Sequence, residues 1–175
     1  MDGAGRYKDA PILRTDRLKL RPYRLEDFDA FARYSASPRS IYTDGPISRE
    51  QAWGQFTGGA GRWQIAGHGA WAVESLADGA HIGLVSLNTA ISLPEPELGW
   101  ILWDGFEGQG FAFEMAACAS RFAFDELGWA RLVSCIHKDN TRSIRLAERL
   151  GCVVDAEMTP PNADTDLIFR HLSKI

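Results

Sequence analysis

The chain has 175 residues, of which 45% are apolar and 24% are charged, and its formal net charge is −4. This length is enough for one well-filled hydrophobic core and short for two, so we expect a single domain at 12–175 after a flexible N-terminus at 1–11. The acidic balance argues against a general nucleic-acid binder, because neutralising phosphates requires a basic face. We therefore expect no nucleic-acid partner.

The cysteines and the first residues of the chain indicate a cellular compartment. Cys118, Cys135 and Cys152 lie far apart among apolar neighbours, without the spacing of a zinc site, which favours buried thiols in a reducing cytoplasm and no bound metal. Residues 1–11 lack the apolar core of a secretory signal, and no apolar run reaches the roughly 18 residues that a membrane span requires. We expect a soluble cytoplasmic protein with no membrane partner.

A strand and a short helix are the first predicted elements. In Leu13–Pro22 leucines alternate with charged residues, which is the period of a half-buried strand, and the proline ends the ladder. Residues 25–35 place apolar side chains on one helical face and acidic residues in the first turn. This pattern predicts a helix directly after the strand.

A connection rich in turn residues, at 37–46, leads to a second helix. Ser48 and Gln51 have the spacing of a capping box, so the helix should begin there, and we expect the glycines at 58–61 to interrupt it. The aromatic residues of this region could form a substrate wall. Aromatic side chains at helical spacing are more often part of the core, and both interpretations stay open.

The middle of the chain has the pattern of a β-hairpin followed by a further strand. Residues 70–75 and 81–87 are rich in strand-forming residues and are joined by Ala-Asp-Gly-Ala, which predicts two antiparallel strands. A loop containing Pro-Glu-Pro at 94–96 precedes a strand at 97–103.

A long helix follows a glycine loop and ends near Gly128. The remaining predicted elements are a strand at 132–136, a helix at 140–150 with a glycine cap at Gly151, and two strands near 152–157 and 166–171. This order predicts an α+β fold with a mixed, mainly antiparallel central sheet and flanking helices.

The glycine loop before the long helix is a candidate anion site. Gly108 and Gly110 allow a sharp turn in which consecutive backbone amides point at one anion, and the start of a helix favours a pyrophosphate. The loop is neither a Walker sequence nor a complete GxGxxG motif. Taken alone, the two glycines could equally well shape a tight turn.

Four segments stand in a characteristic order along the chain: TDRLKLRP at 15–22, GPISREQAW at 45–53, the segment 97–114 that begins with ELGWIL and ends with EGQGFAFE, and NTRSIRLAERLG at 140–151. Together they resemble the GNAT superfamily of N-acetyltransferases, in the branch that resembles ribosomal-protein N-terminal (alanine-type) acetyltransferases. The resemblance implies the acyl-CoA N-acyltransferase fold. It also implies acetyl-CoA as co-substrate and direct transfer of the acetyl group to a primary amine of a peptide, a protein N-terminus or a small molecule.

The resemblance further implies how the co-substrate is bound. Backbone groups of one strand would pair with the pantetheine arm, amides of the glycine loop would hold the pyrophosphate, and the start of the 140–150 helix would face the pantetheine and the sulfur. The implied residues are Ile101, Leu102, Trp103, Gly108, Gln109, Gly110, Phe111, Ala112, Asn140 and Ser143.

One residue beside the loop departs from the family pattern. Glu107 stands where the superfamily often has arginine or glutamine and this branch commonly has tryptophan, so backbone amides must carry the site. Lys138, Arg142 or Arg145 could assist them, or could simply form a solvated helix face.

The resemblance implies two proton transfers, from the amine and to the departing thiolate. The tyrosine that the family often has in the 140–150 helix is replaced by Ala147, which leaves Ser143 as the local proton donor. Glu97 is the candidate general base. It could instead form an ion pair, and proximity alone could supply much of the acceleration.

Two other functions stay open at this point, a non-catalytic acyl-CoA-binding module and a nucleotide-binding domain that uses the glycine loop. The acceptor amine is not encoded in a recognisable motif. We expect its specificity to come from the segments at 37–66 and 157–165. Trp100 and Trp103 alternate across their strand and could pack in the core, contact substrate or form a homodimer surface.

Overall fold

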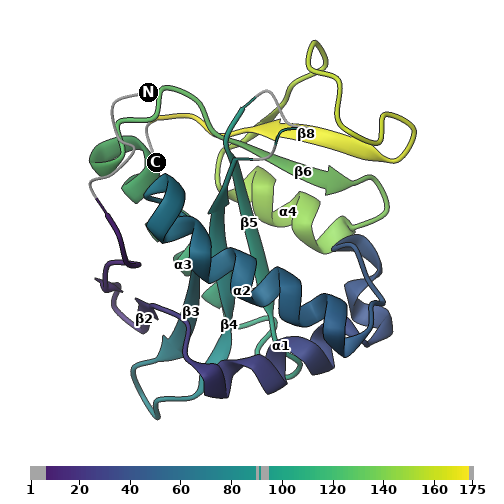
Figure 1. Cartoon of the computed structure of the whole chain (residues 1–175). Helices are drawn as coiled ribbons and strands as arrows, with labels where there is room; N and C mark the ends of the chain where they lie inside the picture. The colour runs from purple at the N-terminus through teal and green to yellow at the C-terminus, as the bar shows by residue number, and fades with distance from the viewer. Residues whose placement is uncertain (1–6, 90, 92–94, 174–175) are drawn as a thin grey trace.

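The computed structural model describes residues 7–89, 91 and 95–173. In these residues the chain forms an eight-stranded sheet in the order β1-β2-β3-β4-β5-β6-β8-β7. Neighbouring strands are antiparallel except β5 and β6, which are parallel. Helices flank the sheet (Figure 1), and the predicted α+β class with a mainly antiparallel sheet is confirmed.

The strands are β1 (Leu13–Arg14), β2 (Leu18–Arg21), β3 (Ala70–Ser75), β4 (His81–Asn88), β5 (Glu97–Leu102), β6 (Val133–His137), β7 (Val153–Val154) and β8 (Asp166–Arg170). The α-helices are α1 (Phe28–Ser35), α2 (Arg49–Ala66), α3 (Phe111–Arg121) and α4 (Thr141–Arg149). Short turns of other helix types are η1 (Leu25–Asp27), η2 (Pro38–Tyr42) and η3 (Phe122–Glu126).

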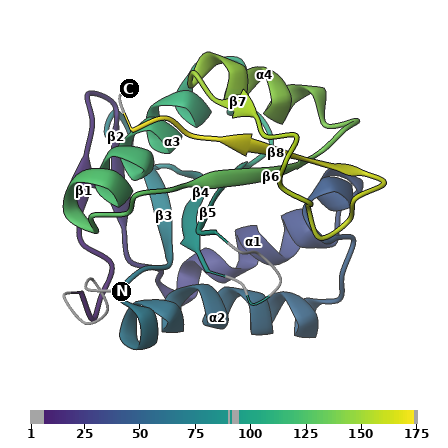
Figure 2. The ribbon, with the colours of Figure 1, turned by 90° about the horizontal axis from the view of Figure 1, so that it is seen from above.

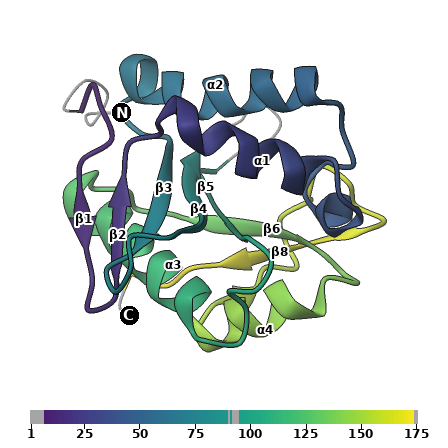
Figure 3. The same ribbon diagram turned by 90° about the horizontal axis from the view of Figure 1, so that it is seen from below.

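The helices cover the two faces of the sheet in pairs. Figures 2 and 3 show α1 and α2 on one face and α3 and α4 on the other. The residues of β5 divide between these faces because side chains alternate along a strand. Ile101 and Trp103 pack with the aromatic side chains of α1 and α2, whereas Leu98, Trp100 and Leu102 pack with the larger core that includes α3 and α4.

Two predicted elements differ from the structure. The strand expected at Leu13–Pro22 is a tight antiparallel pair, β1 and β2, because Thr15 N–H donates to Leu18 O and turns the chain back. The glycines at 58–61 do not interrupt α2, which runs unbroken from Arg49 to Ala66. A Cβ on Gly59 would lie 3.3 Å from Ala70 Cβ, so this glycine lets the helix pack closely on β3.

Other local predictions are confirmed. The side chains and backbones of Ser48 and Gln51 form the expected capping box at the start of α2. The β3–β4 hairpin pairs as predicted, and Gly151 follows α4 with a φ of 77°, as a helix-terminating glycine does. The Pro-Glu-Pro loop at 94–96 lies partly outside the described residues.

The described part of the N-terminal segment packs against the core. Tyr7 contacts the rings of Trp63 and Phe122, and Ala10 is buried. Trp71 Nε1 donates to Pro11 O at 2.8 Å. Residues 1–6, the rest of the terminus that we expected to be flexible, lie outside the described residues.

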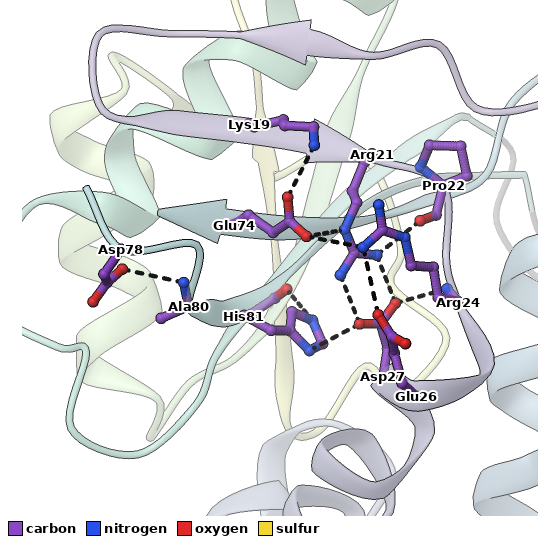
Figure 4. A network of polar contacts seen from close by, with 11 residues as sticks. Lys19, Arg21, Pro22, Arg24, Glu26, Asp27, Glu74, Asp78, Ala80 and His81 are labelled. Atoms are coloured by element: carbon purple, nitrogen blue, oxygen red, sulfur yellow. Dashed lines mark hydrogen bonds and ion pairs between the residues drawn. The ribbon is translucent and has the colours of Figure 1, made fainter. Parts of the chain in front are cut away.

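A buried ionic network joins β2 to η1 and to the β3–β4 hairpin (Figure 4). Arg21 and Asp27 are each 3% exposed and form two parallel hydrogen bonds of 2.7 and 2.8 Å. Glu74 accepts from Arg21 Nε and from Lys19 Nζ, and His81 Nδ1 lies 3.3 Å from Asp27 Oδ1. The network fixes the start of α1 against the sheet.

Replacing Arg21 should therefore destabilise the fold strongly. Arg21→Met leaves two carboxylates without their main cation, one of them deeply buried, and breaking a buried pair typically costs about 3–5 kcal/mol of unfolding free energy. Urea unfolding measures this cost. Lys19→Met, which removes the more exposed partner of Glu74, should cost about 1 kcal/mol or less. Equal costs for the two variants would contradict the importance assigned to the buried pair.

Candidate active site

The sheet opens between its two parallel strands. β5 and β6 share one pair in register, Glu97 with Val133, and then diverge (Figure 1). Just past this pair, side chains replace the backbone ladder: Ser134 Oγ donates to Leu98 O at 2.6 Å, and Cys135 N–H donates to Glu97 Oε1 at 3.3 Å. The opening leaves part of the β5 edge without a neighbouring strand.

A chain of buried hydrogen bonds supports this opening. Because the Ser134 hydroxyl donates to Leu98 O, it accepts from His171 Nε2 at 2.9 Å, which leaves His171 Nδ1 as an acceptor for the Cys152 thiol at 3.3 Å. Burial lowers the pKa of His171 to about 4 and raises the pKa of Cys152 to about 12. The imidazole and the thiol are therefore both neutral and serve a structural role.

The neutral His171 predicts a pH dependence of stability. The folded pKa of about 4 lies below the ordinary value of 6.5, so the unfolded chain binds a proton that the folded chain does not. This contribution is complete above pH 6.5 and is lost as the pH falls toward 4, by about 3 kcal/mol in total. Urea unfolding from pH 7 to 4 should show a steeper loss for the wild type than for His171→Asn. Parallel curves would contradict the assignment.

The edge of β5 that faces the opening can be assigned from the alternation of its hydrogen bonds. Trp103 N–H donates to Ile82 O in β4, whereas Leu98 O accepts from β6. In an antiparallel ladder, alternate residues direct both backbone groups to the same side. The backbones of Trp100 and Leu102 therefore face the opening, and those of Ile101 and Trp103 face β4.

This assignment divides the strand residues implied by the resemblance between the two edges of the strand. Of Ile101, Leu102 and Trp103, only Leu102 presents its backbone to the opening, and Trp100 is the other residue that does so. Ile101 still lines the cavities described below, whereas Trp103 is buried and lines neither.

The glycine loop is anchored from outside. Gly108 and Gly110 have φ values of 77° and 82°, which favour glycine. Arg17 donates to Gln109 O at 2.9 Å, its guanidinium lies 4.7 Å from the centre of the Phe111 ring, and it pairs with Glu114 in the first turn of α3. These contacts fix the loop against the start of the helix.

A cavity of about 730 Å³ lies over the loop, the β5 edge and the start of α4. From the predicted loop set, Gly108, Gly110 and Ala112 line it, whereas Gln109 and Phe111 do not. The first helical hydrogen bond of α3 runs from Glu114 N–H to Gly110 O, so the preceding amides are not used within the helix. We call this space the loop cavity.

The charges around the loop cavity come from several elements. Arg39 from η2 pairs with Asp104 and Glu107, and Arg142 Nη1 lies 3.7 Å from Glu107 Oε1. Arg145 and Arg149 from α4 also line the cavity. Lys138, which we considered as a helper, instead donates to Asp164 O at 2.7 Å.

A second cavity of about 590 Å³, the Glu97 cavity, lies between β5, β6 and the segments after α1 and before β8. It shares with the loop cavity a wall that includes Tyr42, Trp100 and Ser143. Burial raises the pKa of Glu97, and the negative charges of Asp44 and Asp166 raise it further. This carboxylate therefore holds a proton more readily than an ordinary glutamate does.

Ser143 and Asn140 lie at the junction of the two cavities. Ser143 Oγ accepts from Trp100 Nε1 at 3.3 Å, which leaves its hydroxyl proton free to be donated. Asn140 Oδ1 accepts from Ser143 N–H and so caps α4 while lining both cavities. The structure thus places the predicted residues Glu97, Asn140 and Ser143 around two adjacent cavities, and Asn140 and Ser143 line both of them.

Several lining residues carried no signal in the sequence. They are Arg39 in η2, Asp44 in the turn that follows it, Arg62 in α2 and Asp166 in β8, and they reach the cavities only through the fold. Three of these four residues lie in the segment at 37–66, which we expected to shape specificity, and the segment at 157–165 also contributes residues to the Glu97 cavity.

The described residues show neither a metal centre nor a membrane span. In the described ranges, no group of three or more histidine, cysteine or acidic side chains is placed to hold a metal ion. No helix in the same ranges is long and apolar enough to cross a membrane.

Residues 17–153 match the family model described as an acetyltransferase (GNAT) domain. The chain belongs to the GNAT family of N-acetyltransferases. An acetyltransferase from Agrobacterium tumefaciens is 37% identical to this GNAT protein, with a TM-score of 0.89 over 95% of this chain and 96% of the other. The family resemblance of the four sequence segments is confirmed.

Two more distant structures share the fold of this GNAT chain. RimL, a ribosomal L7/L12 alpha-N-protein acetyltransferase in complex with coenzyme A, is 18% identical with a TM-score of 0.75, over 93% of this chain and 98% of RimL. A ribosomal-protein-S5-alanine acetyltransferase from Vibrio fischeri is 14% identical with a TM-score of 0.66, over 94% and 98%. At these identities the likeness shows the fold alone.

Proposed function

We propose that this GNAT protein transfers an acetyl group from acetyl-CoA to a primary amine of a peptide, a protein N-terminus or a small molecule. One observation carries the proposal. The loop cavity and the Glu97 cavity share lining residues that include Ser143, so an acyl donor in the first and an acceptor in the second would lie next to each other.

The residues around the loop cavity fit an acyl-CoA. The edge of β5 at Trp100 and Leu102, which β6 leaves uncovered, can pair with the amides of a pantetheine arm, as an added strand would. The unpaired amides at the start of α3 suit a pyrophosphate, and the arginines add positive charge. The coenzyme A bound by the structural neighbour RimL supports the same donor.

The residues at the junction can manage the two proton transfers. Acetyl-CoA, when bound, would supply the activated acetyl thioester. Glu97, with its raised pKa and its orientation fixed by Cys135 N–H, can accept a proton from the ammonium of the acceptor. The hydroxyl of Ser143 can donate a proton to the coenzyme A thiolate that leaves when the amine takes the acetyl group.

A screen of amines and short peptides with acetyl-CoA tests this function. We expect thiol release that depends on both the protein and one class of acceptor, and binding of acetyl-CoA in calorimetry. Binding without thiol release for any acceptor would favour the non-catalytic acyl-CoA-binding module. No binding at millimolar acetyl-CoA would contradict the proposed donor.

Glu97→Gln tests the general base. We expect kcat to fall by roughly 10²–10⁴, because the amide cannot accept the proton, while acetyl-CoA binding is retained. In the wild type, kcat should fall at acidic pH as the pH drops through the raised pKa of Glu97, and the variant should lose this limb. Glu148→Gln, an exposed α4 carboxylate outside both cavities, is the matched control. An unchanged kcat in Glu97→Gln would contradict the assignment of Glu97 as the general base, but it would not contradict the proposal that the protein is an acetyltransferase.

A further inference from the structure

Arg39 extends from η2 to the residues just before the glycine loop. Its Nη1 donates to Asp104 Oδ1 at 2.8 Å, and its Nη2 pairs with Glu107 Oε1 and lies 3.4 Å from Leu102 O. The guanidinium therefore lies between the free edge of β5 and the loop, and it lines the loop cavity together with Gly108. No motif in the sequence pointed to this residue.

Glu107, one of the two acidic partners of Arg39, is held by the kinds of groups that would hold a bound anion. Glu107 Oε2 accepts from Gly105 N–H at 3.0 Å, and Glu107 Oε1 faces Arg39 and, at 3.7 Å, Arg142. A backbone amide and two guanidinium groups are the donors that a phosphate prefers. The carboxylate thus uses donors beside the glycine loop that an incoming phosphate could use.

The ion pairs of Arg39 can be exchanged. The Asp104 side chain is 93% exposed and that of Glu107 is 32% exposed, so water already competes for both carboxylates. A pyrophosphate carries more negative charge than one carboxylate and accepts the two parallel bonds that an arginine offers. When an acyl donor binds, we therefore expect its pyrophosphate to replace Glu107 as the partner of Arg39.

We propose that Arg39 binds the pyrophosphate of the acyl donor, and that Glu107 is an internal anion that holds Arg39 in place until the donor displaces it. The inference rests on the proposed function for the identity of the donor. It accounts for the acidic residue at position 107: the positive charge of this site comes from η2 and α4, and Glu107 keeps the arginines positioned in the absence of ligand.

Two acyl donors can distinguish phosphate binding by Arg39 from other roles of this residue. Acetyl-CoA carries the pyrophosphate, whereas S-acetylpantetheine has the same thioester and pantetheine without it. Arg39→Ala should reduce kcat/KM for acetyl-CoA by roughly tenfold or more, as expected for lost charge-assisted hydrogen bonds, and leave kcat/KM for S-acetylpantetheine unchanged. The kcat/KM of Arg39→Lys for acetyl-CoA should lie between those of the wild type and Arg39→Ala, because lysine keeps the positive charge but lacks the two parallel N–H donors of the guanidinium. Arg33→Ala, at an exposed arginine outside both cavities, is the control.

Glu107→Gln gives a prediction of opposite sign. Removing the competing carboxylate should lower KM for acetyl-CoA, whereas a carboxylate that merely shapes the loop would raise KM when replaced. The double variant Arg39→Ala/Glu107→Gln should keep the reduced kcat/KM for acetyl-CoA that Arg39→Ala shows. Full recovery in the double variant would show that Arg39 only neutralises Glu107.

Three results would overturn the inference: an equal loss with both donors in Arg39→Ala, a higher KM in Glu107→Gln, or full recovery in the double variant. Each differs from failure of the proposed function, in which the wild type itself would turn over neither donor. Thermal unfolding of every variant shows whether a loss reflects the fold instead.

Discussion

The single pairing point between β5 and β6 is the constraint on which the site depends. Past Glu97 and Val133 the ladder stops, because the hydroxyl of Ser134 and the carboxylate of Glu97 take hydrogen bonds that a continuous sheet would make between backbones. These two bonds satisfy Leu98 O and Cys135 N–H at the start of the opening, which lowers the cost of splitting the sheet there. Both cavities lie along the gap that results.

Strand alternation then separates the two halves of the reaction. Even-numbered residues of β5 direct their backbones into the gap and their side chains toward α3 and α4, whereas Ile101 and Trp103 pack against α1 and α2. The glycine loop and α4 therefore surround one cavity, and the segments next to α1 and before β8 surround the other. Ser143 lies where the two meet, which under the proposed function is where the acyl group passes from donor to acceptor.

The charges of the site are assembled from distant parts of the chain. Near the loop, the acidic residues that adjoin the glycines are matched by Arg39 and Arg142. Around Glu97 the balance is reversed, since Asp44 and Asp166 raise its pKa and Arg62 opposes them. One end of the site thus suits an anionic donor, and the other suits a group that arrives as a cation and gives up a proton. This division agrees with an acyl-CoA donor and an amine acceptor.

Local sequence signals determined most of the elements. The capping box at Ser48, the hairpin turn at 77–80 and the terminal glycine at 151 each depend on neighbouring residues alone, and each is confirmed. A signal that depends on packing gave a wrong prediction. The glycines at 58–61 suggest a helix interruption, but α2 is continuous and Gly59 allows it to pack closely against β3.

The order of the four motifs was sufficient to predict the family, the fold and the position of the glycine loop. Only the tertiary structure decided which backbone groups of β5 are free, because that depends on where β6 leaves the sheet. It also decided that Arg39 and Asp166 join the site, since they lie outside the motifs and far in sequence from the glycine loop and β5, and meet these only when the sheet and helices pack. The amino-acid sequence thus determined the local conformations and the family. The long-range packing decided the charges and the open edge, because neither is a property of neighbouring residues.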